Sequence, residues 1–414
     1  MDRQGLGSAR IMQGNALALD LPDSSVDLVV TSPPYFGLRS YQDAGEHYAG
    51  QIGSEATPAE FVDALIAATA EMVRVLKPSG SIWVNLGDKY ASTSTPGPQS
   101  QHSTMTGGRH KGVDHVLPRR LTPGAPPKSL IGVPWRYAIR CIDDLGLILR
   151  AEVIWSKPNG LPESVTDRVR RSHETWFHFT KMPRYYSAVD EIREPLVYPA
   201  DGDRARAGKR ALGVIDGQGA AGNTSGSNPL GKLPGSVWTI PTQPLTVPAS
   251  LGIDHFAAFP MEWPRRIIRG WSPAGVCVAC GEGRRPVVDK TTTGKDNSYA
   301  PDRARSTVDV KTWKAMKAEH PDTITGYACD CPDTTAPTTP GVVLDPFGGT
   351  GTTALVAKVL GREGISNDMS ADYCRLATWR TTDPDQIASA MQVDKPAKQV
   401  EGQWDLFGLD GQAS

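Results

Sequence analysis

Two short segments combine residue types that could bind a ligand and support chemistry, although they stand far apart in the 414-residue chain. Residues 31–35 are Thr-Ser-Pro-Pro-Tyr and close the apolar, β-branched run Val26–Thr31. Residues 345–353 are Asp-Pro-Phe-Gly-Gly-Thr-Gly-Thr-Thr and follow the apolar residues 342–344. Each segment therefore begins where a buried strand is predicted to end, which is where open α/β sheets bind their ligands.

The glycine-rich segment at 345–353 is predicted to bind a nucleoside. Its glycines let a ligand approach the backbone closely, and the helix that follows presents unpaired N–H groups. It lacks the lysine of a phosphate-binding P-loop and the third glycine of a dinucleotide-binding loop. Asp368, at the end of the next predicted strand, is placed to bind ribose hydroxyls. These features suit S-adenosylmethionine (AdoMet), and a tight structural turn is the alternative.

The proline-rich turn at 31–35 has groups that suit methyl transfer to an amine. Its prolines fix φ and remove N–H donors, so that nearby carbonyl groups lack a local partner. The exocyclic amine of cytosine or adenine is a poor nucleophile, and acceptors that bond its protons would localise the nitrogen lone pair. An aromatic ring can stack on a base swung out of the duplex. Ser32, Pro33, Pro34 and Tyr35 supply these features, and a plain proline turn is the alternative.

Four of the six cysteines form two close pairs in the sequence, Cys277 with Cys280 and Cys329 with Cys331. Four thiolates in two such pairs fit a tetrahedral structural zinc site, which would stabilise an insertion that lacks a core of its own. The Cys-x-Cys half is less usual than Cys-x-x-Cys. Unpaired reduced thiols are the alternative.

The surrounding pattern predicts an open, parallel α/β sheet that positions both segments. A capping box at Thr57–Glu60, with Pro58 at the first helical position, opens a helix predicted over 61–76. The residues Lys-Pro-Ser-Gly at 77–80 are predicted to end it. Further strands are predicted at 81–86, 148–155, 342–344 and 364–367, and further helices at 135–145 and 352–360.

Taken together, the two segments resemble the amino-methyltransferases of DNA, in the permuted order where the catalytic motif precedes the AdoMet motif. Further similarity lies in the lead into the turn at 20–30, a central block at 155–159, 162–168 and 173–174, and the segment His-Phe-Ala-Ala-Phe-Pro at 255–260. One departure is Asn15, where such enzymes commonly carry Asp.

The resemblance implies a Rossmann-like AdoMet-dependent sheet of seven strands with circularly permuted motif order. It implies catalysis by residues 32–35, base flipping and direct attack of the amine on the methyl group. The cofactor contacts that it implies are Asp345, Phe347, Gly349, Gly351, Thr352 and Asp368. Serine at the first position of the turn is more typical of enzymes that methylate N4 of cytosine, whereas Asp or Asn is more typical of N6-adenine enzymes. We therefore predict a site-specific N4-cytosine DNA methyltransferase, with N6-adenine as the alternative.

Three other functions fit less well. Methylation at C5 of cytosine needs a cysteine nucleophile, usually after proline, and none of the six cysteines follows a proline. Methylation of a protein glutamine uses a related turn with asparagine in place of serine and has the glycine motif first in the chain. A non-enzymatic, zinc-bearing DNA-binding protein would explain the cysteines but leaves both crevice motifs without a role.

The composition indicates an ordinary globular chain, with 39% apolar and 21% charged residues. A net charge of −1 neither favours nor excludes a DNA partner, because only the contacting face must be positive. No apolar run reaches the ~20 residues of a membrane span, so a cytoplasmic location without membrane contact is expected.

The predicted organisation divides the chain around the two motifs. We expect residues 1–90 and 129–200 to form a catalytic half, 236–275 and 341–385 an AdoMet-binding half, 91–128 a flexible insertion, 201–235 a flexible target-recognition segment, 276–340 a zinc-binding insertion, and 386–414 a tail. Within the tail, Gln403-Trp404-Asp405-Leu406-Phe407 resembles the peptide by which bacterial replication proteins dock on the sliding clamp. The alternative is that this peptide folds back onto the enzyme.

Overall fold

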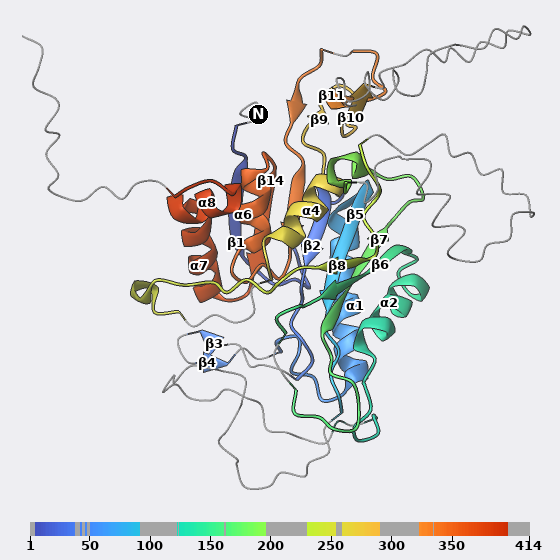
Figure 1. Cartoon of the computed structure of the whole chain (residues 1–414), viewed down its shortest axis with the longest axis vertical. Coiled ribbons are helices and arrows are strands. Elements are labelled where there is room, and N and C mark those ends of the chain that lie inside the picture. The colour runs from blue at the N-terminus through green and yellow to red at the C-terminus, as the bar shows by residue number, and fades with distance from the viewer. Residues whose placement is uncertain are drawn as a thin grey trace, which may run out of the picture.

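The computed structural model is organised around one eight-stranded sheet (Figure 1). The structure describes residues 5–37, 42–43, 46–47, 50–91, 122, 124–160, 163–195, 230–253, 259–289, 323–333 and 335–395. In spatial order the strands are β1 (Ser8–Gln13), β14 (Glu363–Asp368), β13 (Val342–Asp345), β2 (Val26–Thr31), β5 (Leu76–Leu86), β7 (His173–Thr180), β6 (Ile148–Ser156) and β8 (Val237–Thr239).

The sheet is mixed, which corrects the prediction of a parallel sheet and the expected count of seven strands. Strands β1, β14, β13, β2 and β5 are parallel neighbours. Strand β7 runs antiparallel to both β5 and β6, and the short β8 adds a parallel edge beside β6. Consecutive strands β6 and β7 pair directly without a crossover helix, a connection that only antiparallel neighbours allow.

Strand β2 lies at the centre and is buried along its whole length. After a register shift between Val26 and Leu28, its side chains alternate between the two faces of the sheet, as the period of a strand requires. Val26 and Val29 join one hydrophobic core, whereas Leu28 and Val30 join the other. Because both faces are covered, residues 28–30 are apolar without alternation.

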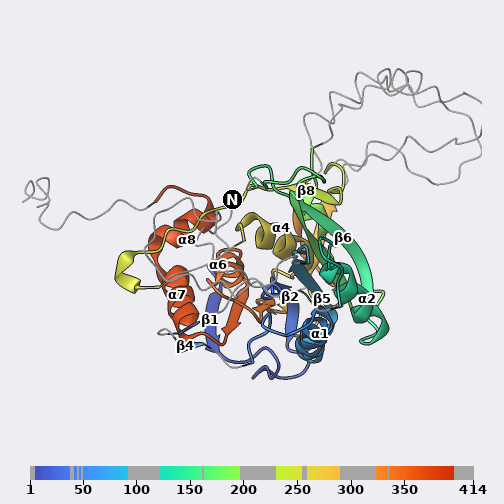
Figure 2. The same cartoon turned by 90° about the horizontal axis from the view of Figure 1, so that it is seen from below.

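Helices cover both faces of the sheet (Figure 2). Helices α1 (Pro58–Val75) and α2 (Val133–Asp143) contribute to one core, and α4 (Glu262–Trp271) and α6 (Thr352–Val359) contribute to the other. Helix α7 (Ala371–Thr382) packs against β1 and β14, and α8 (Pro384–Met391) packs against α6 and α7. The capping box predicted for α1 is confirmed, since Thr57 and Glu60 bond to each other's backbone N–H groups.

The helix ends before residues 77–80, as predicted, since α1 stops at Val75, but the next strand begins at Leu76 rather than at the predicted residue 81. Residues 77–80 form an irregularity within this strand. The pairing with β2 passes from Val26 opposite Leu76 to Leu28 opposite Ser81, so that the backbone of residues 77–80 is not paired with β2. The proline and glycine in this segment are therefore accommodated as a bulge.

Small two-stranded sheets complete the described structure. They pair β3 (Gln42–Asp43) with β4 (Glu46–His47), β9 (Val276–Cys277) with β12 (Thr338–Thr339), and β10 (Arg285–Asp289) with β11 (Thr323–Ala328). Short 3₁₀ turns lie at Val189–Ile192 and Ala249–Leu251. Within the described ranges, no helix has both the length and the apolarity that crossing a bilayer requires.

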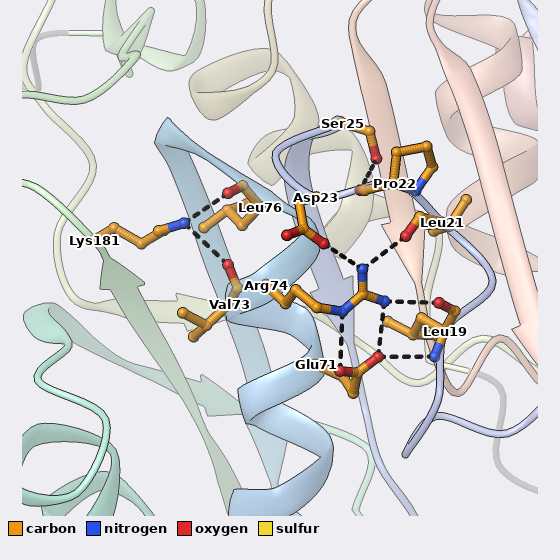
Figure 3. Close-up of polar contacts among 10 residues, drawn as sticks. All are labelled: Leu19, Leu21, Pro22, Asp23, Ser25, Glu71, Val73, Arg74, Leu76 and Lys181. Carbon is orange, nitrogen blue, oxygen red and sulfur yellow. Dashed lines mark hydrogen bonds and ion pairs between the residues drawn. The ribbon is translucent and has the colours of Figure 1, made fainter.

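The segment that leads into β2 is fastened to α1 by one side chain, Arg74 (Figure 3). Its guanidinium donates to the carbonyl oxygens of Leu19 and Leu21 at 2.7 and 2.9 Å, and to Asp23 at 2.7 Å. Glu71, one turn earlier on the helix, accepts from Arg74 and from the Leu19 N–H. The planar fork of the guanidinium thus holds three residues of the segment in one arrangement.

A second cation closes the end of the same helix. The Lys181 ammonium donates to the carbonyl oxygens of Val73 and Leu76, at 3.0 and 2.9 Å (Figure 3). A lysine there satisfies carbonyl groups that have no partner within the helix and interacts favourably with the helix dipole.

We expect Arg74→Met to lower the midpoint of thermal unfolding, because the two carbonyl groups lose their donors and Glu71 loses its cation. The unfolding midpoint of Arg74→Lys should lie between that of Arg74→Met and that of the unmodified protein, since an ammonium group cannot reproduce the planar, forked geometry of a guanidinium. The measurement is thermal denaturation followed by circular dichroism. Arg10→Met is the matched control, because Arg10 forms an exposed pair with Glu363 at 3.5 Å. Equal midpoints for Arg74→Met and Arg10→Met would contradict this role.

Candidate active site

A cavity of about 430 Å³ opens at the carboxyl ends of the central parallel strands. Its wall includes residues 32–35 after β2, residues 346–350 after β13 and residues 368–370 after β14. Residues 14–17, 50–52 and 242–245 complete much of the remainder. The volume lies in the range typical of small-molecule pockets.

The two predicted motifs meet in this cavity because β2 and β13 are neighbours in the sheet. Val343 and Leu344 pair with Leu28 and Val29. From this junction the chain leads through α1 to β5 on one side, and through α6 to β14 on the other. The loops after β2 and β13 therefore diverge and leave a crevice between them, which is the topological switch point where open α/β sheets bind ligands.

Asp345 joins the two motifs beneath the cavity. Thr31 donates to one of its carboxylate oxygens at 2.6 Å, and Thr353 donates to the other at 2.9 Å. The Phe347 N–H also donates to it, at 3.2 Å. Asp345 is 1% exposed. Burial raises the pKa of its carboxyl group to about 7, although the hydrogen bonds from Thr31, Thr353 and Phe347 oppose that shift.

The glycine loop is held open by its own backbone and by Asp368. Gly349 and Gly351 have φ angles of +49° and +73°, in the left-handed region that favours glycine. The Gly349 N–H donates to Asp368 at 2.8 Å. The same carboxylate accepts from the Ser370 N–H at 2.9 Å. Asp368 therefore lies at the cavity wall in an orientation set in part by these two backbone N–H groups.

The turn after β2 presents an acceptor to the cavity. The Ser32 hydroxyl donates its proton to the Asn85 side-chain oxygen at 3.2 Å. Asn85, on β5, is held in turn by a bond from its side-chain nitrogen to the Thr175 carbonyl. With its proton committed to Asn85, the Ser32 oxygen has lone pairs left to accept an N–H from a ligand.

Tyr35 is positioned from its hydroxyl end. That hydroxyl lies 2.8 Å from the Asn85 oxygen and 2.8 Å from a carboxylate oxygen of Glu174, and its single proton can serve one of them at a time. Glu174 also pairs with Lys157 at 2.5 Å. A Cβ at Gly87 would lie 2.7 Å from the Tyr35 ring, so glycine there leaves room for it.

Most of the predicted site residues lie at this cavity. Ser32, Pro33, Pro34, Tyr35, Phe347, Gly349, Thr352 and Asp368 line it. Asp345 and Gly351 do not: Asp345 is buried below the wall, and Gly351 caps the first turn of α6. Asn15 lines the cavity, and its side-chain oxygen accepts from the Leu17 N–H at 2.9 Å.

The polar residues of the site that the sequence prediction missed include Asn85, Lys157 and Glu174, which are bonded to one another or to the turn. Two of them stand in segments that had been matched to the family, at 155–159 and 173–174, but no role was assigned to them. Asn85 had a different indication, because it is a polar residue near the end of an otherwise apolar strand and is 1% exposed. Buried polar groups of this kind need partners, and here the partners are the catalytic candidates.

Three of the four predicted zinc ligands come together away from the cavity. The sulfur atoms of Cys277, Cys280 and Cys329 lie within 4.8 Å of one another. Cys331 is outside this group, although it lies within the described part of the chain. Thus the structure groups one cysteine of the second pair, and not both, with the first pair.

Several predictions concern segments outside the described residues. These are residues 254–258 of the His-Phe-Ala-Ala-Phe-Pro segment, nearly all of 91–128 and 201–235, residues 290–322 within the cysteine-bearing insertion, and the peptide Gln403–Phe407. The division into functional segments and the docking peptide stay predictions.

Comparison with known proteins identifies relatives over most of the chain. A family model described as DNA methylase, for N6 and N4 methyltransferases, matches residues 26–279 and 335–378. The type II methyltransferase M.XycI of Xanthomonas campestris pv. cyanopsidis is 36% identical over 65% of this chain and 75% of its own length. M.SmaI of Serratia marcescens is 30% identical over 91% of both chains. Among solved structures, PvuII DNA methyltransferase aligns over 94% of this chain and 92% of its own, with 19% identity and a TM-score of 0.49.

The raised pKa of Asp345 predicts how stability changes with pH. The folded state holds the proton up to about pH 7, whereas an unfolded aspartate releases it near pH 4. Between these values the native state binds more protons, so its stability contribution falls as pH rises and levels off above pH 7. We expect urea denaturation to show that Asp345→Asn, a near-isosteric change, removes this decline. Parallel pH curves for the variant and the unmodified protein would refute the assignment.

Proposed function

The chain belongs to the DNA methylase family of N4- and N6-amino methyltransferases, whose members depend on AdoMet, and on that basis we propose that it methylates N4 of cytosine in double-stranded DNA. The observation that carries the choice of base is serine at the first position of the turn, with its hydroxyl oriented as an acceptor by Asn85. Serine at this position is more typical of N4-cytosine enzymes.

The cavity residues fit AdoMet as cofactor. Asp368 lies at the end of the strand after the glycine loop, where a carboxylate can accept both ribose hydroxyls. Phe347 and Phe259 give apolar surface for the adenine and the methionine chain. The loop contains no lysine, which agrees with a ligand that has no phosphate. When bound, AdoMet supplies a methyl group on a positively charged sulfur.

The residues of the turn orient and activate the target amine. The Ser32 oxygen and the Pro33 carbonyl accept one N–H each, which localises the nitrogen lone pair. Tyr35 stacks on the flipped base, because its hydroxyl is tethered by Asn85 and Glu174 and its ring is thereby held in one orientation. The amine nitrogen then forms a bond to the methyl carbon as the carbon–sulfur bond breaks, and the nitrogen releases one proton to solvent. No covalent intermediate with the enzyme forms.

The biological role that we propose follows from the relatives. M.XycI and M.SmaI are both named type II methyltransferases. We infer that this chain likewise serves as the modification enzyme of a restriction–modification system. Segments 91–128 and 201–235, together with the cysteine-bearing insertion, are the proposed target-recognition elements because their sequences lack the regular strand and helix patterns found elsewhere in the chain.

The decisive experiment is to incubate the protein with varied duplex DNAs and isotopically labelled AdoMet, digest the DNA and identify the methylated nucleoside by mass spectrometry. We expect N4-methylcytosine. Ser32→Ala should lower the rate by about 100-fold or more, because losing one preorganised polar group that stabilises developing charge, in the known case a hydrogen-bond donor, costs about that much. Tyr35→Phe should retain more activity than Tyr35→Ala, since it keeps the stacking ring.

Three outcomes separate the alternatives. N6-methyladenine would keep the mechanism and change the base. Absence of any methylated nucleoside, despite measurable AdoMet binding, would refute DNA methylation by this chain alone. Full activity of Ser32→Ala would refute the assigned role of the turn.

We also propose that the cysteine group binds one structural zinc ion. A tetrahedral zinc with sulfur ligands at about 2.3 Å has sulfur–sulfur edges of about 3.8 Å. The Cys280 and Cys329 sulfur atoms lie 3.7 Å apart, and Cys277 joins them. The thiolates of these three residues supply three of the four ligands, and Cys331, two residues beyond Cys329, is the proposed fourth. The ion would pin the β9 turn to the end of β11.

Metal analysis of the purified full-length chain tests this assignment. We expect one zinc per chain, lost in Cys280→Ser and Cys329→Ser and kept in Cys374→Ser, which changes a thiol outside the group. Loss of zinc in Cys331→Ser would establish that residue as the fourth ligand, whereas retention would assign the position to another group. A metal-free protein, or unchanged zinc in Cys280→Ser, would refute the site.

A further inference from the structure

A lysine of the cavity wall, Lys157, has no role in the function derived so far beyond its pairing with Glu174. It directly follows β6, and Glu174 is the second residue of the neighbouring β7. Both residues line the cavity. The Lys157 side chain is 19% exposed, and lysine is rarely so far removed from water unless its charge has a use.

The Lys157 ammonium is held in place from two sides. It lies 2.5 Å from one carboxylate oxygen of Glu174 and 4.1 Å from the centre of the Trp155 ring. That ring is fixed in turn, because its N–H donates to the Ile240 carbonyl at 2.7 Å. An ammonium has three N–H groups, and within the described part of the chain Glu174 is the hydrogen-bond acceptor found for it. The group can therefore donate to a ligand in the cavity from a defined position.

This ammonium ends a row of polar groups that begins at the catalytic turn. The Ser32 hydroxyl lies 3.2 Å from the Asn85 oxygen, which lies 2.8 Å from the Tyr35 hydroxyl. The same Tyr35 hydroxyl lies 2.8 Å from the second carboxylate oxygen of Glu174, whose first oxygen bonds to Lys157. The two ends of the row differ in character. The Ser32 end offers an acceptor to a ligand, whereas the Lys157 end offers a donor.

Cytosine has the complementary order of groups along its Watson–Crick edge. Its N4 amine donates, and its N3 and O2 atoms accept. Adenine has a similar amine and an acceptor at N1, but a C–H group stands where cytosine has O2. Enzymes that flip a base read this edge by hydrogen bonds in the pocket. A donor placed opposite O2 therefore distinguishes the two bases, whereas the acceptors for the amine do not.

We propose that Lys157 donates a hydrogen bond to O2 of the flipped cytosine and thereby selects cytosine over adenine. The inference rests on the proposed function and identifies a residue that determines its base preference. Glu174 balances the charge of the ammonium, so the contact adds no net positive charge beside the sulfonium group of the cofactor. The pair recognises the base and takes no part in moving the methyl group or the proton.

The test measures single-turnover methylation of two duplexes by the full-length chain. One contains the target cytosine, and the other has at that position a 2-aminopyridine C-nucleoside, which keeps the amine and the adjacent ring nitrogen but has C–H in place of C2=O. We expect Lys157→Met to lower the ratio of the cytosine rate to the analogue rate by roughly 10- to 100-fold, the range for a hydrogen bond to a charged group. The intrinsic reactivity of the two amines differs, but that difference is common to both proteins and cancels in the comparison.

Three further variants sharpen the comparison. Lys157→Arg should keep part of the cytosine preference, because it keeps a cationic donor. Lys395→Met is the matched control and should leave the ratio unchanged, since Lys395 forms an exposed pair with Asp385 at 3.5 Å. If Lys157→Met fails to fold, Lys157→Gln decides the matter: a lowered ratio supports the contact with O2, and an unchanged ratio overturns it.

A purely structural role for Lys157, acting through Glu174 on Tyr35, predicts a different result. Both duplexes would then be methylated more slowly by the same factor, and an unchanged ratio would overturn the proposal. With adenine at the target position, Lys157→Met should also raise the yield of N6-methyladenine relative to N4-methylcytosine, which a structural role would not do. Failure of the proposed function is distinguishable, because the unmodified protein would then form no N4-methylcytosine on the first duplex.

Discussion

The site depends on one buried interaction, the hydrogen bond between Thr31 and Asp345. It joins residues 314 positions apart in the chain, at the ends of two neighbouring parallel strands. Because Asp345 also accepts from Thr353 and from the Phe347 N–H, the same carboxylate determines where the glycine loop begins and where α6 starts. The turn proposed to hold the base and the loop proposed to hold the cofactor are therefore both held in place by hydrogen bonds to Asp345. A small shift at Asp345 would change the distance between acceptor and methyl donor, a distance to which reaction rates are very sensitive.

Buried charge of both signs accompanies this arrangement. Asp345 is the last residue of β13, where the glycine loop begins, and Arg380 on α7 bonds to Thr350 and Thr352 of that loop. Burial disfavours the charged form of each. Asp345 accepts hydrogen bonds from three donors of the protein itself. Arg380 donates to the hydroxyls of Thr350 and Thr352, and its Nε has no hydrogen-bond partner among the described residues.

How much of this the sequence predicts depends on whether a residue acts through its neighbours in the chain or across the sheet. Ser32, Tyr35 and Asp368 were predictable because each follows a recognisable strand, and strand ends define the crevice. Asn85 and Glu174 bond to Tyr35 from other strands, and their approach requires the strand order, including the antiparallel β7 that the sequence pattern did not predict. For Asp345, the sequence indicates that the residue matters but not how it is placed. Its family match indicates cofactor contact, but its depth and its three donors become apparent only in three dimensions.

The identity of Asn85 bears on how the reaction disposes of its proton. Its amide cannot take up a proton near neutral pH, so the chain from Ser32 to Asn85 can orient the target amine but cannot act as a base. Glu174, which is connected to Asn85 through the Tyr35 hydroxyl, is also engaged by Lys157. Acceptance of N–H bonds by Ser32 and Pro33 requires no change of protonation in either residue. The proposed mechanism therefore relies on preorganised acceptors rather than on a general base.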